Sequence, residues 1–212
     1  YKDRDGKLWV SAFDVESFII DIRDYIVQKY PLPDLRNQLK ANPAINSLCK
    51  DEDGIFWFSQ DRYGLCIYDS RKEKLKHYSQ CQGTRNLPFG DVTNIARSYN
   101  HNWIWATSYG PTVFGLSQQN MEMKEDVRIE LGNVTNNPGL ITSLFEDPQN
   151  NLWIGTTTGL FVYRIMSATL ESIPELSGPV AGITQTADSR IWTVIRNKGI
   201  YRIGQDKGIE SY

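Results

Sequence analysis

Tryptophan recurs along this chain at an almost fixed interval, and this period constrains the fold more than any other feature. Four of the tryptophans are spaced 48 residues apart and a fifth follows after 39: Trp9, Trp57, Trp105, Trp153 and Trp192. The clearest copies begin with an acidic turn and end with the tryptophan, as in residues 51–57 and 147–153. A period in this range is the sequence signature of a repeat array or a propeller.

Each copy predicts a unit of short β-strands. A first segment rich in aliphatic and β-branched residues precedes the tryptophan strand, at residues 45–49, 92–96, 140–145 and 180–184. A turn with glycine follows the tryptophan strand and leads to a third strand, at residues 65–68, 160–163 and 200–203. A weaker fourth segment, such as residues 75–78, completes the unit. Four short antiparallel strands in about 40–45 residues match one propeller blade, and the segments lack the 3.6-residue period of a helical array.

We therefore expect an all-β protein: a β-propeller segment over residues 1–212, built from four-stranded antiparallel blades in a partial ring of about four to five blades. The blades are centred on Trp9, Trp57, Trp103 or Trp105, Trp153 and Trp192. In the third copy, the spacing to Gly110 favours Trp103, whereas the 48-residue period favours Trp105. From Trp192 through the chain end to Trp9 is 29 residues, shorter than a blade interval. A fragment of a longer sensor region is therefore expected, and a closed five-bladed ring is the cramped alternative.

Residues 140–163 carry a family resemblance. They read Leu-Ile-Thr-Ser-Leu-Phe-Glu-Asp-Pro-Gln-Asn-Asn-Leu-Trp-Ile-Gly-Thr-Thr-Thr-Gly-Leu-Phe-Val-Tyr. This resembles the two-component-regulator propeller repeat: an aliphatic strand, Glu-Asp, Gly or Asn, Leu-Trp-Ile-Gly-Thr, then Gly-Leu and an aromatic residue. Residues 45–69 and 180–203 are looser copies, and the first and third copies are degenerate. The resemblance implies the periplasmic sensor region of a hybrid two-component histidine kinase from Bacteroides-like bacteria, where such sensors commonly respond to oligosaccharides.

The resemblance also implies where other activities lie. Kinase activity, and any transmembrane segments, belong to parts of the full-length receptor outside this chain. That receptor is expected to be a homodimer in the inner membrane, with an oligosaccharide as the ligand and no cofactor. The alternative is an interaction scaffold that binds another protein and no small molecule.

Blade topology predicts a ligand-binding face. The turn between the second and third strands of a blade lies on the same face of the ring as the link into the next blade. Sugars offer hydroxyl groups to planar polar side chains and C–H faces to aromatic rings. Side chains of these kinds in the predicted turns are Arg62, Tyr63, Tyr109, Arg196 and Asn197. The tryptophans, with their fixed place in the repeat, are expected to pack between blades instead.

Other chemistry finds little support. The net charge is −2 and no basic stripe exists, which argues against nucleic-acid binding. Residues 51–54 look like the start of a calcium loop, but the glutamate of the twelfth loop position is absent, so we predict a tight turn and no metal site. The predicted ligand face offers Asp61 alone, whereas a glycosidase needs two carboxylates. A glycosidase-like or lyase-like propeller is thus the weakest alternative, and the chain is not expected to be an enzyme. Cys49 and Cys66 are expected to be small core residues.

Overall fold

The computed structural model describes residues 7–10, 18–21, 26–29, 45–51, 53–60, 64–69, 71–72, 74–78, 91–119, 122–204 and 208–212. These residues form five antiparallel sheets, one of three strands and four of four strands. We call the sheets the first to the fifth blade, in chain order. The first blade contains β1 (Lys7–Val10), β2 (Phe18–Asp21) and β3 (Ile26–Lys29). The all-β prediction is confirmed.

Within every blade the strands follow one another in chain order. The second blade contains β4 (Ile45–Lys50), β5 (Ile55–Gln60), β6 (Gly64–Asp69) and β7 (Lys74–Tyr78). The third contains β8 (Asn94–Arg97), β9 (Ile104–Thr107), β10 (Thr112–Gln119) and β11 (Glu122–Glu130), followed by the short 3-10 helix η2 (Leu131–Asn133). The fourth contains β12 (Ile141–Glu146), β13 (Asn151–Thr156), β14 (Gly159–Arg164) and β15 (Thr169–Ser177). The fifth contains β16 (Val180–Gln185), β17 (Ile191–Ile195), β18 (Gly199–Ile203) and β19 (Ile209–Ser211).

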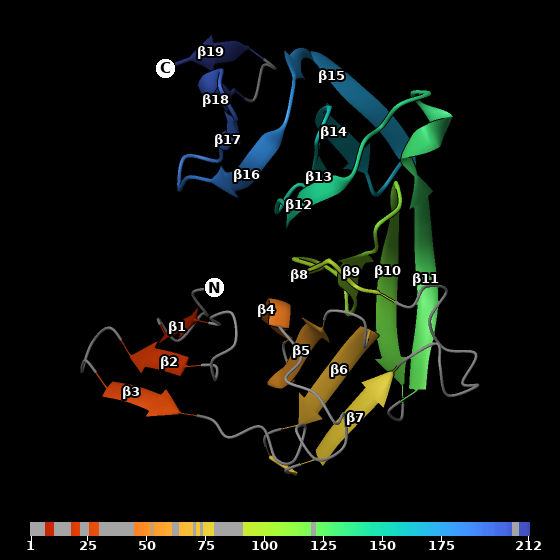
Figure 1. Ribbon diagram of the computed structural model, residues 1–212, viewed down its shortest axis with the longest axis vertical. Helices are drawn as coiled ribbons and strands as arrows, with labels where there is room; N and C mark the ends of the chain where they lie inside the picture. Colours follow the sequence, from red (N-terminus) through yellow and green to blue (C-terminus); the bar gives the residue numbers. More distant parts are fainter. Residues whose placement is uncertain are drawn as a thin grey trace.

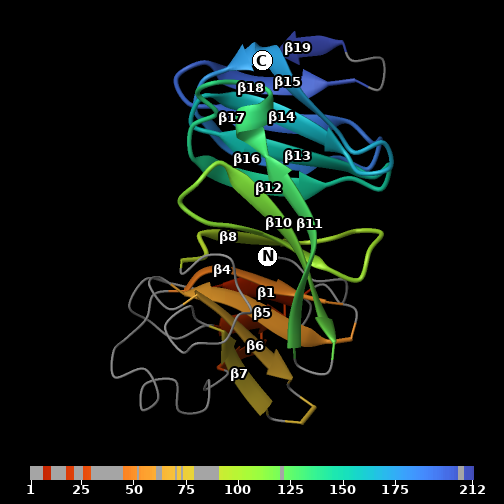
Figure 2. The same cartoon turned by 90° about the vertical axis from the view of Figure 1, so that its right-hand side faces the viewer.

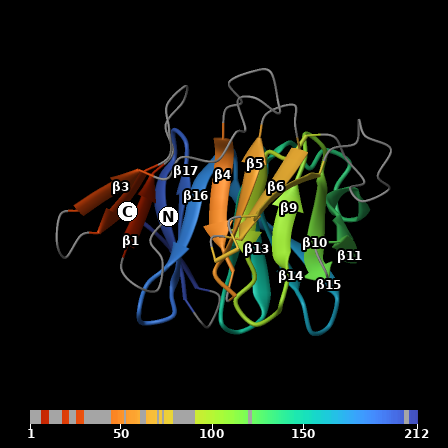
Figure 3. The same cartoon turned by 90° about the horizontal axis from the view of Figure 1, so that it is seen from below.

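The blades are arranged around a common centre. Figure 1 shows the first strand of each blade near the centre and the last strand at the outside, with β1–β3 and β16–β19 at the two ends of the arc. The inner strands pack in sequence, β4 against β8, β8 against β12 and β12 against β16. Figure 2 shows the blades stacked from β4–β7 to β16–β19. Because the strands cross the thickness of the ring, the turns gather at its two opposite faces (Figure 3).

In the second, third and fourth blades, the side of the blade that carries the tryptophan faces the next blade. Trp57, Trp105 and Trp153 are 2%, 0% and 9% exposed. Each is surrounded by aliphatic and aromatic side chains of its own blade and of the blade that follows. Around Trp153, the following blade contributes Val180, Ile191, Ile195 and Ile203. The prediction that these tryptophans pack between blades is confirmed, while the side chain of Trp9 lies outside the described residues.

The third blade resolves the choice between its two tryptophans. Trp105 lies in β9 opposite Ala96, as Trp153 lies in β13 opposite Phe145. Trp105 therefore holds the repeat position, and Trp103 lies in the preceding turn. The paired residues Ala96 and Trp105 are nine positions apart in the sequence, whereas the equivalent pair in the fourth blade, Phe145 and Trp153, is eight positions apart. The turn before the tryptophan strand is therefore one residue longer in the third blade. The conflicting spacing to Gly110 arises because β10 begins at Thr112, two residues after this glycine, whereas β6, β14 and β18 each begin at their glycine.

Polar side chains tie each inner strand to the next. The side chains donate to backbone carbonyls of the following inner strand in three places: Ser47 Oγ to Ile95 O at 3.1 Å, Asn94 Nδ2 to Ile141 O at 3.3 Å and Thr142 Oγ1 to Val180 O at 2.8 Å. One such bond lies at each of the three junctions from the second to the fifth blade, so side-chain bonds connect these inner strands at the centre of the blades.

The two described cysteines belong to the core. Cys49 and Cys66 are 2% and 0% exposed, and burial raises the pKa of both thiols. A buried thiol that stays protonated behaves as a small hydrophobic side chain. The prediction for both cysteines is confirmed, whereas Cys81 lies outside the described residues.

Candidate functional site

The predicted ligand residues lie in turns that the structure describes in part. Tyr109, in the turn between β9 and β10, is 59% exposed. Arg196 and Asn197 are exposed in the turn between β17 and β18. The whole fourth blade separates these two turns, so the structure does not bring the three side chains together as neighbours. Arg62 and Tyr63 lie outside the described residues, and a role for any of the five in ligand binding stays a prediction.

The predicted face itself has the expected construction. In the fourth blade, Thr157 N donates to Leu140 O at 2.9 Å, and Thr158 Oγ1 donates to Pro138 O at 2.8 Å. In the fifth blade, Arg196 N donates to Pro179 O at 2.9 Å. Each of these bonds joins a turn between the second and third strands to the link that enters the same blade. Turns and links therefore share one face in these two blades, as predicted.

The opposite face is built on acidic turns that hold the tryptophans. Asp147 is 3% exposed, and its Oδ1 accepts bonds from the backbone N–H groups of Gln149 and Asn151, both at 2.9 Å. Its Oδ2 accepts from Trp153 Nε1 at 2.8 Å. Asp51 plays the same part in the second blade, accepting from Trp57 Nε1 at 2.7 Å. The acidic phrase of the repeat is thus a turn that caps the tryptophan.

The third blade departs from this rule. Ser98 stands where the other turn carries Asp147, and its Oγ accepts from the backbone N–H of His101 at 3.1 Å. The indole of Trp105 turns to the next blade instead, where its Nε1 donates to Glu146 Oε2 at 2.5 Å. Glu146 is 4% exposed. The acceptor missing from the third blade is therefore supplied by the fourth.

Asn100 closes the same junction. Its backbone N–H donates to Glu146 Oε1 at 3.3 Å. Its Nδ2 donates to Pro148 O at 3.1 Å and to Asn150 Oδ1 at 3.0 Å. The turn of the third blade is therefore fastened directly to the turn of the fourth, and these bonds occupy the space between the two turns.

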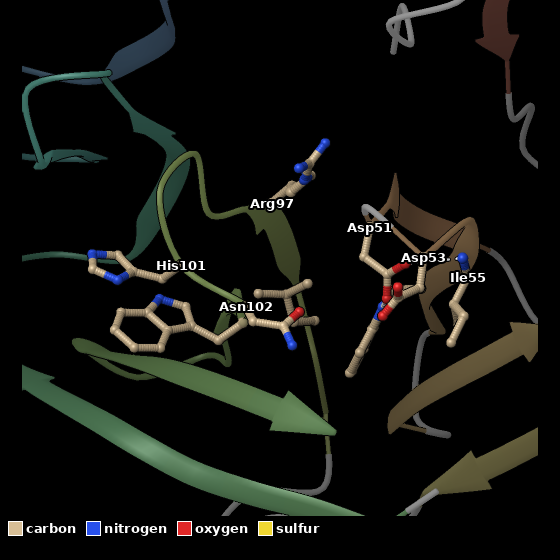
Figure 4. Close-up of a pocket in the computed structure, with 9 residues that line it drawn as sticks. Asp51, Asp53, Ile55, Arg97, His101 and Asn102 are labelled. Atoms are coloured by element: carbon tan, nitrogen blue, oxygen red, sulfur yellow. Dashed lines mark hydrogen bonds between the residues drawn. The ribbon is translucent and has the colours of Figure 1, made fainter. Parts of the chain in front are cut away.

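A pocket lies at the preceding junction, between the turns of the second and third blades. Its lining comes from β5 and the turn before it, and from β8, β9 and the turn between them: Asp51, Asp53, Ile55, Trp57, Arg97, His101, Asn102, Trp103 and Ile104. Figure 4 shows the Asn102 amide facing the carboxyl groups of Asp51 and Asp53 across the pocket, with Arg97 on a third side. The pocket therefore combines an apolar floor with planar polar groups, which is typical of small-ligand sites.

Burial and hydrogen bonds to Asp51 set the electrostatics of the pocket. Burial raises the pKa of Asp51 above that of an ordinary aspartate, while its bonds to Trp57 Nε1 and to the backbone N–H of Ile55 oppose the shift. On the third-blade side, the His101 ring stacks on Trp103 with centroids 4.2 Å apart. Among the described residues, the buried His101 Nε2 and Trp103 Nε1 have no hydrogen-bond partner. Buried polar atoms are normally hydrogen-bonded, and a bound ligand or an ordered water molecule can be the partner of these two nitrogens.

The sequence interpretation missed this pocket because it assigned the acidic turns to structure alone. A signal was present in the residue that ends each inner strand beside the turn. Aligned by strand register, this position holds Lys50, Arg97, Glu146 and Gln185. Three different chemical types at one repeat position indicate that each blade junction on this face is built differently.

Comparison with known proteins agrees with this architecture. Residues 137–158 match the two component regulator propeller family. The matched residues include β12, β13 and the Asp147 turn, which lie within the segment that carried the resemblance. The resemblance is thus confirmed for this one repeat. No curated protein sequence matches the chain.

Solved structures show the same fold at low sequence identity. An extracellular domain assigned to a hybrid two component system of B. thetaiotaomicron aligns with TM-score 0.73 and 16% identity, over 99% of this chain and 27% of that one. One assigned to a one component system of the same organism aligns with TM-score 0.62 and 20% identity, over 96% and 25%. The Cps50 (Swd1) β-propeller domain of Myceliophteria thermophila aligns with TM-score 0.70 and 11% identity, over 97% and 66%. The chain is a β-propeller and spans about a quarter of the two bacterial domains. In the described part of the chain, no helix has the length and apolar character needed to cross a membrane.

Proposed function

We propose that this chain is a ligand-sensing propeller segment of a hybrid two-component histidine kinase, located in the periplasm, that binds oligosaccharide fragments and regulates polysaccharide-utilisation genes. The observation that carries the proposal is the match of residues 137–158 to the two component regulator propeller family. The structural likeness to an extracellular domain assigned to such a system supports it. The matched proteins are sensor and propeller domains, and we propose no catalytic activity for this chain. Kinase output and membrane attachment belong to other parts of the receptor.

Sugar binding should be visible as thermal stabilisation. A ligand that binds only the folded state adds about 2.7 kcal/mol to the unfolding free energy at a hundredfold excess over its Kd. For a chain of this size, this corresponds to a rise in Tm of roughly 5–10 °C. We expect one class in a panel of plant and host oligosaccharides to produce such a rise in a thermal melt. A cooperative melt that no sugar of the panel shifts would contradict the sensor proposal.

An exposed sheet face favours a second candidate function, that of an interaction scaffold. On the fifth blade, Val194, Ile200 and Tyr212 are 41%, 44% and 63% exposed. They lie on the side that carries Trp192, which in the three preceding blades is covered by a neighbour. Arg202 takes the place of Val162 beside the tryptophan, and its charge is paired with Glu210. Covering this face would cost less than burying an unpaired Arg202, although desolvating the Arg202–Glu210 pair still opposes it.

The scaffold candidate makes a prediction for this face. The double variant Val194→Thr, Ile200→Thr should keep the stability of the parent chain to within about 0.5 kcal/mol, because both side chains are exposed. The parent chain should associate with itself at high concentration, and the variant should sediment as a monomer. Sedimentation velocity and a urea melt measure the two effects. Unchanged association in the variant would show that this face is not an interface.

A further inference from the structure

We propose that the pocket between the second and third blades binds one neutral pyranose unit of the ligand. This inference rests on the proposed sensor function and deepens it by naming the site and the class of sugar. The site lies on the ring face opposite Tyr109, Arg196 and Asn197. Binding there and binding at those turns are therefore separable by experiment.

The chemistry of the pocket matches a sugar ring. Ile55 and Trp103, which are partly exposed, supply the apolar surface on which the C–H face of a pyranose can lie, whereas Trp57 and Ile104 are 2% and 1% exposed. Around it, carboxylate oxygens accept bonds from hydroxyl groups, while Arg97 and the Asn102 amide can donate. Figure 4 shows the Asn102 amide and the carboxyl groups of Asp51 and Asp53 facing one another, while the Arg97 side chain extends away from them. A hydroxyl group both donates and accepts, so a pyranose can use both kinds of partner at once.

The neighbouring junctions show why the space is available here. Between the third and fourth blades, Asn100 binds Pro148 and Asn150 directly. Between the fourth and fifth blades, Gln185 Nε2 lies 3.5 Å from Gln149 Oε1. At the second junction, the corresponding turns border the pocket instead. A bound sugar would take the place that side-chain bonds between neighbouring turns occupy at the other two junctions.

Charge indicates the class of sugar. The pocket lining contains two carboxyl groups, of Asp51 and Asp53, against the single guanidinium of Arg97. A third carboxylate, from a uronic acid, would meet this excess of negative charge at close range, which is unfavourable in a partly buried site. The opposite face carries Arg196 and Lys198 in one exposed turn and would favour acidic sugars. Binding of a neutral sugar would therefore support the pocket as the site, and binding of an acidic sugar would support the turns of the opposite face.

The test is isothermal titration calorimetry on the whole chain. The probes are cellotetraose, xylotetraose, mannotetraose and maltotetraose as neutral sugars, and tetragalacturonate as an acidic one. We expect a neutral probe to bind, and Asn102→Ala and Asp53→Asn each to weaken its binding about tenfold. Asn102 and Asp53 are exposed, so both variants should keep the Tm of the parent chain. Asn136→Ala removes an exposed amide from a link on the other face and is the matched control, with unchanged affinity.

The outcomes separate this inference from the proposed function. Neutral-sugar binding that both pocket variants weaken, and that Asn136→Ala leaves intact, supports the site. Binding of any probe that Asn102→Ala and Asp53→Asn leave unchanged overturns the site and leaves the sensor function standing. Loss of that binding in Arg196→Ala or Tyr109→Ala would assign it to the opposite face. If no probe binds the parent chain, the sensor proposal fails and the site fails with it.

Discussion

Replacing Asp147 with alanine should lower the free energy of unfolding by about 3–4 kcal/mol. The carboxylate is buried and accepts bonds from two backbone N–H groups, from the Asn151 amide and from Trp153 Nε1. Alanine leaves all of these donors without their partner at the junction of the fourth and fifth blades. Urea denaturation followed by tryptophan fluorescence measures the loss.

The fifth blade provides the comparison for this variant. There Thr186 Oγ1 accepts from Trp192 Nε1 at 3.1 Å, so a neutral hydroxyl fills the position of the carboxylate. Asp147→Thr should therefore recover part of the stability that Asp147→Ala loses. Thr186→Ala should cost only about 1 kcal/mol, because Trp192 lies on a face that is not covered. Equal losses for Asp147→Ala and Thr186→Ala would show that burial of the turn does not govern the effect.

Replacing Glu146 with alanine should cost about 2–3 kcal/mol. The carboxylate is 4% exposed and is the acceptor for the indole of Trp105, which is fully buried one blade away. Alanine would leave that indole N–H unpaired and would also remove the acceptor for the backbone N–H of Asn100. Because both bonds cross the junction, the loss should appear as weaker contact between the third and fourth blades. Hydrogen exchange at the Asn100 amide, together with urea denaturation, measures it.

Two controls sharpen this prediction. Glu175→Ala removes an exposed glutamate from β15 and should change the stability by less than about 0.5 kcal/mol. Glu146→Gln keeps an oxygen that can accept from one of the two donors, so it should be less damaging than alanine. If Glu146→Ala is as stable as Glu175→Ala, the bond between the blades contributes nothing measurable and the account of this junction is wrong.

The repeat period predicted the blades because the second, third and fourth blades each bury the side that carries the tryptophan against the next blade. The apolar positions of β4, β8, β12 and β16 follow from that burial, and their segments were found from the sequence. The third copy was ambiguous because its turn glycine, Gly110, lies two residues before β10, whereas the glycines of the second, fourth and fifth blades are the first residues of their third strands. Register depends on pairing between strands, which a single sequence does not display.

The candidate pocket could not be predicted in the same way. Asp51 and Asp53 belong to the repeat phrase, and His101 and Asn102 belong to its most degenerate copy, so nothing in the chain order joins them. They meet because β4 packs against β8, which places two turns about 50 residues apart beside one another. Likewise, Glu146 reads as part of the repeat phrase, and only its position shows that it serves a tryptophan of the preceding blade.

Local patterns repeated along the chain were enough to predict the all-β architecture, the strand segments and the turns before the tryptophans. The structure adds that an aspartate of this turn holds the tryptophan in the second and fourth blades, and it shows how neighbouring blades meet. Contacts between blades involve residues that are a whole repeat apart, and at each junction the chemistry depends on which side chains face one another there. Glu146 closes one junction, whereas Arg97 borders a pocket at another, although both residues hold the same place in the repeat.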